Sequence, residues 1–385
     1  MSSGGEYAWV ETQTRIRREA TTKDLQDAIR DGDALGNINI VGAMARPSEI
    51  PLKIRDIYIY AQLIKGTRKP CFAWIHDEAS ARYVLEIFKV VAGGAMELSH
   101  KPRVVAFVEA TSPLQYGKES LDVLIQFSKL GLPVGFGPMS MAMATAPVTL
   151  AGTVAQENAE ILAGIVVSQI LHPGMPVVYW GVPHIMDPRT GNISFGSPEQ
   201  GLMAAAIAQI ANYYGLPVGL NVGLTDAKMP DAQAGLEKGM TLIMGALAGA
   251  DIPGHMGISG ADQGASLEQL IIDNEMVGYI KRILRGFEVT ENTLAFDVLA
   301  RVGIGGNFLV DEHTLTHYKS EIWMPRICDR ENWESWLTCG GKNMLDNAVE
   351  EKERILREHI SEPLDDDMQK EIDKIVAVAE RELLS

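Results

Sequence analysis

The segment SPEQGLMAAAIAQIANYYGLPVGLNVG, residues 197–223, contains the helix-to-strand connection that decides the fold class. Its Ser-Pro start and the glycine at 215 are typical of the two ends of a helix, and an apolar strand-like run follows from Pro217. The same order of helix, glycine, proline and strand recurs around GLPVG at 131–135 and GMPVV at 174–178. Helices that alternate with strands in this way predict parallel βαβ units.

Short apolar or β-branched runs recur along the chain between helix-length segments. The clear candidates for strands lie at residues 38–43, 70–76, 103–110, 133–139, 176–184, 217–223 and 251–257, and a weaker eighth candidate lies at 302–309. They are apolar on both faces, as a buried parallel sheet requires. Eight units over roughly 300 residues favour a (β/α)8 TIM barrel over an open doubly wound sheet.

Three regions are expected, although no change in composition and no low-complexity linker divides the chain. Residues 1–36 are predicted to form an N-terminal helical extension, residues 37–342 the barrel, and residues 343–385 charged C-terminal helices. The charged segments should cover the outside of the barrel with a solvated face, or meet a partner.

Composition limits the class of partner. The 385-residue chain carries a formal net charge of −16, which argues against nucleic acid and disfavours an anionic membrane surface. No run reaches the roughly 18 apolar residues of a membrane span, and the first residues do not have the pattern of a signal peptide. Cys71, Cys328 and Cys339 are far apart and form no CxxC pair, so we expect no disulfide framework and a reducing cytoplasm.

Catalysis in a barrel belongs at the carboxyl ends of the strands. The candidate side chains there are Glu109, Met139, Ser140, Thr145, Tyr179, Trp180, His184, Asn221, His255 and Asn307. This set has few carboxylates and no evident metal-binding group. Several interpretations stay open: Tyr179-Trp180 is either core packing or an aromatic wall for a cation, Glu109 is either a counter-charge or half of a salt bridge, and each histidine is either functional or structural.

Two familiar-looking motifs receive little weight. GIGGN at 303–307 lacks the full spacing and the acidic residue of a dinucleotide-binding loop. His313 and His317 have the spacing of two zinc ligands, but no glutamate stands in the required place and no third ligand is evident. We expect these histidines to pack or cap a helix, and we predict no metal site in the chain.

Long ordered blocks of the chain resemble the trimethylamine methyltransferase family. The resemblance runs from about residue 38 to about residue 359 and is carried by residues 146–164, PGMPVVYWG at 173–181, TDAKMPDAQAGLEK at 225–238, and residues 266–289 and 302–336. It implies a (β/α)8 barrel that moves a methyl group from an amine nitrogen to the cobalt of a corrinoid held on a separate small protein. Family members are longer at the N-terminus, so this chain begins inside the family pattern.

The founding archaeal members of the family contain pyrrolysine, whereas this sequence has only standard amino acids. The resemblance is therefore to the branch without pyrrolysine, which is similar to glycine betaine methyltransferase and favours quaternary amines. A quaternary ammonium leaves as a neutral amine and needs no proton, so the enzyme's task is mainly placement of the methyl group and exclusion of water.

The resemblance also implies roles for the strand-end residues. Tyr179 and Trp180, with Phe136 beside them, would face the cation, and Glu109 would add a counter-charge. His255, Asn221 and His184 would hydrogen-bond the carboxylate of a betaine; of the predicted residues, His255, Glu109 and Asn221 are our choice for the catalytic set. Thr145, at the end of the loop 137–145 that would shape the mouth, is also predicted to bind substrate. Met139, Ser140 and Asn307 would face the corrinoid as it enters that mouth.

The helix-like segment 146–164 raises a separate question, because it is apolar enough for a core yet carries several polar residues. We expect Thr145 and Thr149 at the rim of the mouth, and Gln156, Glu157 and Glu160 bonded to loops on the outside of the barrel. Unpaired buried polar groups would be costly there.

Three functions are consistent with the sequence. The first is a corrinoid-dependent methyltransferase for a quaternary amine, with a cognate corrinoid protein as its partner and with homo-oligomers possible. The second is a non-catalytic barrel that binds an amine or betaine. The third is a barrel lyase or aldolase, which would need a Schiff-base lysine or metal-binding carboxylates at strand ends. Lys228 is the only lysine placed near one.

Overall fold

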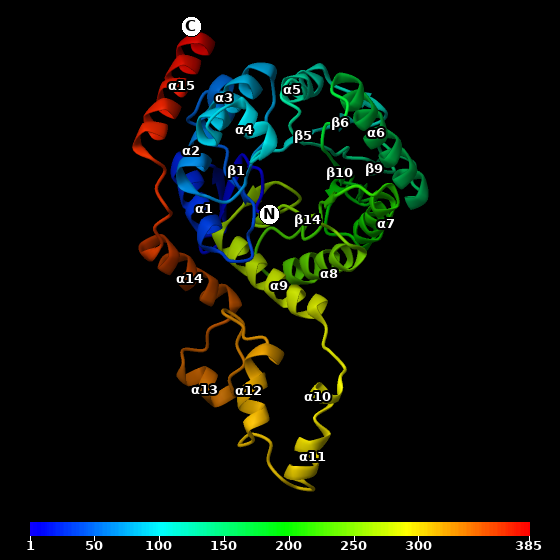
Figure 1. The fold of residues 1–385 in the computed structure, drawn as a ribbon, viewed down its shortest axis with the longest axis vertical. Helices are drawn as coiled ribbons and strands as arrows, with labels where there is room; N and C mark the ends of the chain where they lie inside the picture. Colours follow the sequence, from blue (N-terminus) through cyan, green and yellow to red (C-terminus); the bar gives the residue numbers. More distant parts are fainter.

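The computed structural model describes residues 1–385, and its centre is a parallel β-sheet within a ring of helices (Figure 1). Strands are hydrogen-bonded in the order β14-β13-β10-β8-β5, and β3 and β4 form a second parallel pair. The bounds are β3 Val41–Gly42, β4 Cys71–Phe72, β5 Ala106–Val108, β8 Val134–Phe136, β10 Val177–Gly181, β13 Val218–Leu220 and β14 Ile252–Pro253. Each lies within one of the seven clear strand predictions, which are confirmed.

A helix follows each of these strands. The helices are α2 Leu52–Gly66, α3 Glu78–Ala92 with α4 Ala95–His100, α5 Lys118–Ser128, α6 Leu150–Leu171, α7 Pro198–Tyr214, α8 Ala232–Ala248 and α9 Leu267–Arg285. Gly215 ends α7 at φ +67°, and Gly131 and Gly174 also have positive φ. The glycine-proline connections therefore lead from a helix into the next strand, as predicted. A mixed α/β fold with a parallel sheet is confirmed.

The eighth predicted strand, residues 302–309, is wrong. Its first residue ends α11 (Phe296–Val302), and the rest is an exposed loop with positive φ at Gly303 and Gly305. Its apolar residues have no sheet edge to pair with. Instead, residues 1–3 lie between β3 and β14: the backbone N–H of Ser2 donates to Ile40 O, and that of Ser3 donates to Met256 O.

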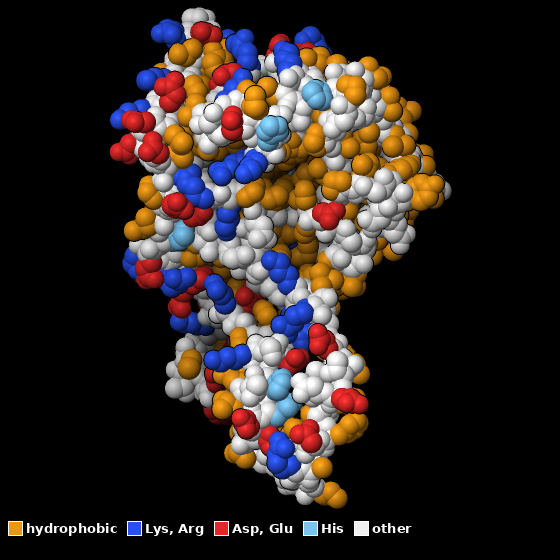
Figure 2. Space-filling view, in the orientation of Figure 1, with side chains coloured by type: hydrophobic (Ala, Val, Ile, Leu, Met, Phe, Trp, Pro, Cys, Tyr) orange, Lys and Arg blue, Asp and Glu red, His pale blue; other side chains and the backbone are white.

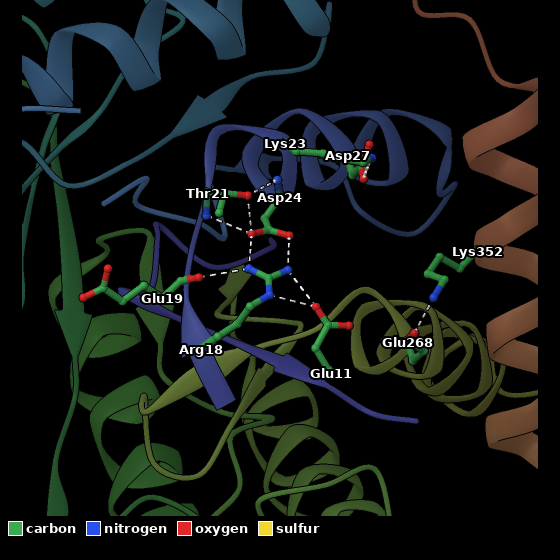
Figure 3. A network of polar contacts seen from close by, with 9 residues as sticks. All are labelled: Glu11, Arg18, Glu19, Thr21, Lys23, Asp24, Asp27, Glu268 and Lys352. Carbon is green, nitrogen blue, oxygen red and sulfur yellow. Dashed lines mark hydrogen bonds and ion pairs between the residues drawn. The ribbon is translucent and has the colours of Figure 1, made fainter. Parts of the chain in front are cut away.

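The N-terminal region begins with strands, although we predicted a helical extension. β1 (Ala8–Glu11) and β2 (Ile16–Glu19) form an antiparallel hairpin before α1 (Thr22–Ala34). β15 (Ile258–Ser259) and β16 (Gly264–Ala265) form a second hairpin, and β16 also pairs with β1. The Arg18 guanidinium binds both oxygens of Asp24 at 2.6 and 2.8 Å and also contacts Glu11 (Figure 3). This bidentate pair joins the hairpin to the capping box of α1.

Short strands beyond the carboxyl ends of the sheet tie its loops together. β9 (Met141–Ala142) pairs with β11 (His184–Met186), which pairs with β12 (Ile193–Ser194). β6 (Ala110–Thr111) and β7 (Gln115–Tyr116) form a small hairpin after β5. The loops at this edge are therefore ordered by backbone hydrogen bonds across different units.

The C-terminal part contains a projecting segment and two packed helices. Residues 286–343, which we call the arm, hold α10 (Glu291–Leu294), α11, α12 (Glu312–Glu321) and α13 (Trp333–Thr338), and extend away from the ring (Figure 1). α14 (Met344–Glu358) then packs on α9 and α1, and α15 (Asp366–Leu384) packs on α2 and α3. Lys352 of α14 pairs with Glu268 of α9 at 2.6 Å (Figure 3). None of the helices combines the length and apolar character needed to cross a bilayer.

Candidate active site

Aromatic side chains on or just after β4, β5, β10 and β14 contact one another. Phe72 of β4 stacks on Trp180 of β10 with ring centroids 5.9 Å apart, and Trp74 stacks on His255, also at 5.9 Å. Phe107 of β5 meets both tryptophans edge-on, at 5.0 Å from Trp74 and 5.4 Å from Trp180. Because β4 and β10 are not neighbours in the sheet, their contact crosses its interior. We call these five residues the aromatic cluster.

The aromatic cluster is closed on one side and partly open on the other. Phe72 and Trp180 are fully buried, whereas Trp74 and Phe107 are half-buried. Faces of Trp and Phe rings attract cations, and the attraction grows when the cation leaves water. The half-buried rings can therefore hold an apolar cation such as a quaternary ammonium.

Several buried polar atoms in and beside the aromatic cluster have no hydrogen-bond partner in the chain. They are Trp180 Nε1, His255 Nε2 and Asn221 Oδ1. Buried polar atoms are nearly always paired, so unpaired ones mark places where a ligand or water completes the set. Burial lowers the pKa of His255 to about 3, so its ring is neutral at physiological pH and can offer a hydrogen bond but no charge.

Three carboxyl groups lie close enough for their charges to interact. Burial raises the pKa of both Glu6 and Asp262, and each of the two also feels a neighbouring acid. Glu109 exposes its side chain, but it is surrounded by enough protein that desolvation still raises its pKa. The carboxyl groups at this edge therefore hold protons more tightly than free acids do.

A buried ion pair stands beside these acids. Arg46 Nη2 binds Asp56 Oδ1 at 2.7 Å, and His76 Nδ1 lies 2.9 Å from Asp56 Oδ2. Burial alone would raise the pKa of Asp56, but the His76 hydrogen bond and the Arg46 charge outweigh it and lower that pKa. Arg46 Nε and Nη1 are buried without a partner. The guanidinium thus has donors free for a further polar group.

Two carboxyl groups of α6 hold the loops at the carboxyl edge. Glu157 accepts from the backbone N–H of Ser140 at 3.2 Å and of Val182 at 2.7 Å. Glu160 accepts from Leu114 N and Ser112 Oγ, each at 2.7 Å. Burial raises the pKa of Glu157 to about 8. The polar residues of this apolar helix are therefore bonded to loops, but these loops follow β5, β8 and β10 at the carboxyl edge. The expected place on the outside of the barrel is wrong, because both carboxyl groups are buried.

Two predicted substrate residues do not face the aromatic cluster. Tyr179 points to the opposite side of β10 from Trp180, where its hydroxyl bonds Asn158 of α6 at 2.8 Å. Phe136 packs against α6, so closely that a Cβ on Gly164 would lie 2.3 Å from its ring. The expectation that these two rings face the same space as Trp180 is wrong, because alternate residues of a strand point to opposite faces.

The other predicted residues occupy different positions at the carboxyl edge. Met139 packs against the buried group that contains Trp180. Ser140 and Thr145 make hydrogen bonds that stabilise the loop. The Ser140 N–H donates to Glu157, and Thr145 Oγ1 accepts from the backbone N–H of Met141 at 2.9 Å. His184 is buried on β11, its Nδ1 lies 2.9 Å from Val182 O, and burial lowers its pKa. Asn221 ends beside Gly254, the neighbour of His255.

Asn307 does not lie at the carboxyl edge of the sheet. It stands in the arm after α11, where its Oδ1 accepts from the backbone N–H of Leu309 at 2.8 Å. Its placement beside the corrinoid-facing loop is wrong, since that placement depended on an eighth strand that does not form.

Sequence reasoning missed part of the site. The missed residues are Phe72, Trp74, Phe107, Glu6, Arg46 and Asp56. A signal existed for the first two, because Phe72 and Trp74 are two apart in the predicted strand 70–76 and therefore share a face. No sequence spacing connects the others, which arrive from separate strands.

Comparison with known proteins identifies the family of this chain. The family pattern described as trimethylamine methyltransferase (MTTB) matches residues 5–383. The chain belongs to this family. It is therefore a methyltransferase, and the resemblance noted over residues 38–359 is confirmed and extends further in both directions.

Individual members of the trimethylamine methyltransferase family are similar along most of this chain. The trimethylamine methyltransferase MttB of Desulfitobacterium hafniense is 33% identical over 97% of this chain and 75% of its own length. A glycine betaine methyltransferase of the same species is 32% identical over 95% of this chain and 77% of its own length. The monomethylamine methyltransferase structure from Methanosarcina barkeri covers 93% of this chain at 12% identity with a TM-score of 0.45.

Proposed function

We propose that this chain moves a methyl group from a quaternary amine to the Co(I) of a corrinoid carried on a separate protein. The aromatic cluster carries the proposal, because it offers stacked and edge-on rings with neutral polar atoms at the carboxyl ends of parallel strands. One of the relatives described above is named for trimethylamine and another for glycine betaine, and both names fit a methylated amine as substrate.

We also propose that the fold is a complete (β/α)8 barrel whose eighth strand is residues 1–3. Its support is the pair of backbone hydrogen bonds from Ser2 to Ile40 and from Ser3 to Met256, which join these residues to both β3 and β14. The active site then occupies the usual face of such a barrel.

The chemistry needs little acid or base. The C–N bond breaks with its electron pair staying on nitrogen, the methyl group bonds to cobalt through the electron pair of Co(I), and a neutral tertiary amine leaves. No proton is transferred to the amine. A neutral His255 and a Glu6 carboxyl group whose pKa burial raises to about 8 suit this requirement, because neither group must titrate during the step.

The residues of this chain bind and orient the substrate. Trp74, Phe107 and Trp180 hold the ammonium group by the faces of their rings and exclude water from it. His255 and Asn221 offer hydrogen bonds to the polar end of the amine, and Glu109 adds negative charge near the cation. Met139 and Ser140 lie on the loop that the corrinoid protein approaches, which Glu157 holds in place.

The test is a methyl-transfer assay with the full chain, Co(I) cobalamin and a panel of amines. The panel contains glycine betaine, proline betaine, carnitine, choline, dimethylglycine and trimethylamine, and methylcobalamin is followed by its absorbance. We expect turnover of at least one quaternary amine and none of dimethylglycine. Calorimetric binding of an amine without turnover, even with candidate corrinoid proteins present, would favour the non-catalytic amine-binding barrel instead.

A further inference from the structure

The arm has almost no core of its own. Of residues 286–343, only Val298 and Ile327 are buried. Its tip, which we define as residues 296–310, exposes large apolar side chains, among them Phe296 at 67%, Leu309 at 77% and Val310 at 84%. The nine residues VGIGGNFLV at 302–310 contain no charge. An exposed apolar surface of this kind marks an interaction site.

The base of the arm is nevertheless anchored. Glu275 of α9 accepts from the backbone N–H groups of Arg326 and Ile327 at 2.7 and 3.2 Å, and Trp323 packs edge-on against Tyr279 at 5.4 Å. The arm therefore leaves the ring in a defined direction, with its apolar tip held at the end farthest from the ring (Figure 1).

A second surface lies on the outside of α6, α7 and α8, which we call the outer wall, and none of the charged residues of these three helices is exposed. The only charged residues of α6 are Glu157 and Glu160, and both are buried. Ile170 of α6, Leu202 of α7 and Leu247 of α8 are each more than half exposed. A helix that is apolar on all sides is normally covered, yet α14 and α15 cover α1, α2 and α3 instead. The space-filling view likewise shows hydrophobic side chains gathered over the ring (Figure 2).

A groove in the outer wall matches the size of a few side chains. It lies between α6 and α7, has a volume of about 550 Å3, and is lined mainly by apolar residues that include Leu150, Val154, Leu202 and Ile210. The arm of the same chain leaves the ring from α9, away from α6 and α7 (Figure 1), so its tip points away from this groove.

We infer that the arm tip of one copy of this chain docks in the α6–α7 groove of a second copy. Charge supports the second copy as occupant. Residues 302–310 of the tip carry no charge, and the two charged residues of the tip, Asp297 and Arg301, pair with each other at 3.7 Å. No charged residue of the outer wall is exposed, whereas the other long exterior helices carry charged residues that would be desolvated by an apolar tip. Every copy supplies one tip and one groove, so the contact is head-to-tail and can close into a ring of subunits.

The corrinoid protein is a poorer occupant for either surface. It must reach the carboxyl ends of the strands, but the arm leaves from the opposite edge. Leu284, at the end of α9, lines a pocket with Asn39 and Asp251, which precede β3 and β14. The outer wall is on the side of the ring, so both surfaces stay available while the active-site face is occupied.

The experiment uses the full chain and measures mass by light scattering after size exclusion. Wild type should show a multiple of 42.0 kDa. A tip variant, Ile304→Asp with Leu309→Asp, and a wall variant, Ala155→Asp with Leu202→Asp, should each be monomeric while keeping the wild-type circular dichroism. A control, Ile360→Asp, changes an 88% exposed side chain outside both surfaces and should assemble as wild type does.

Mixing the two variants decides the geometry. The tip variant keeps an intact groove and the wall variant keeps an intact tip, so the mixture should form a heterodimer of twice 42.0 kDa and nothing larger. A monomeric wild type would overturn the inference. So would a wall variant that still assembles, because the tips would then meet each other, and so would a mixture that stays monomeric.

Discussion

Trp74 and His255 stack with ring centroids 5.9 Å apart and their planes 14° from parallel, although one follows β4 and the other follows β14. Neither strand pairs with the other, so this contact exists only because the strands curve around a shared interior. One ring is half-buried and the other is buried, which places the pair at the boundary between the aromatic cluster and solvent.

Trp74→Ala should weaken binding of the quaternary amine, because a desolvated cation–π contact is worth about 1–2 kcal/mol, or roughly 5- to 30-fold in affinity. Calorimetry with the amine that turns over measures this loss. Trp333→Ala is the matched control, since Trp333 is 68% exposed on α13 in the arm. If Trp74→Ala and wild type bind the amine with equal affinity, the aromatic cluster is not the amine-binding site.

His255→Gln should make the free energy of unfolding depend less on pH below pH 6.5. The folded-state pKa of His255 is lowered to about 3, while the unfolded ring has its ordinary pKa of 6.5. Between these values the unfolded chain binds the extra proton, so His255 makes the protein less stable as the pH falls from 6.5 towards 3. Urea midpoints at pH 7 and pH 4.5 should differ less in His255→Gln than in wild type. An unchanged difference would mean that His255 already accepts a proton in the folded state.

Glu157→Ala should destabilise the fold by about 2–5 kcal/mol, because it leaves the N–H groups of Ser140 and Val182 buried without acceptors. It should also raise KM for the corrinoid substrate, since the Ser140 loop loses its anchor. Thermal unfolding and steady-state kinetics measure the two effects. Glu119→Ala, an exposed acid on α5, should change neither. A stable Glu157→Ala variant with normal kinetics contradicts the anchoring role.

Tyr179→Phe and Trp180→Phe should separate the two faces of β10. Tyr179→Phe removes the hydrogen bond to Asn158 and should cost about 1 kcal/mol of stability without changing amine affinity. Trp180→Phe should weaken amine binding instead, because Trp180 belongs to the aromatic cluster. Affinity and the free energy of unfolding, measured on both variants, test the assignment. A loss of amine affinity in Tyr179→Phe would restore our first interpretation of that residue.

Much of the fold could be read from local chemistry. The connections at 131–135, 174–178 and 215–219 predicted helix-to-strand turns, because glycine permits positive φ and proline disfavours further helix. The failure at 302–309 has an equally local cause. A short apolar run predicts a buried strand, but the same pattern also occurs in segments whose apolar side chains are exposed in the single chain.

The sequence by itself determined the alternation of strands and helices and the family, since periodicity, turn residues and long ordered blocks are local properties. It also contained the rule that Tyr179 and Trp180 must face opposite sides of a strand. Only the tertiary structure decided which of the two faces inward, and that Trp180 shares its space with Phe72, Trp74, Phe107 and His255. Those contacts join residues far apart in the chain, and they depend on how strands curve and pack, which no spacing along the chain encodes.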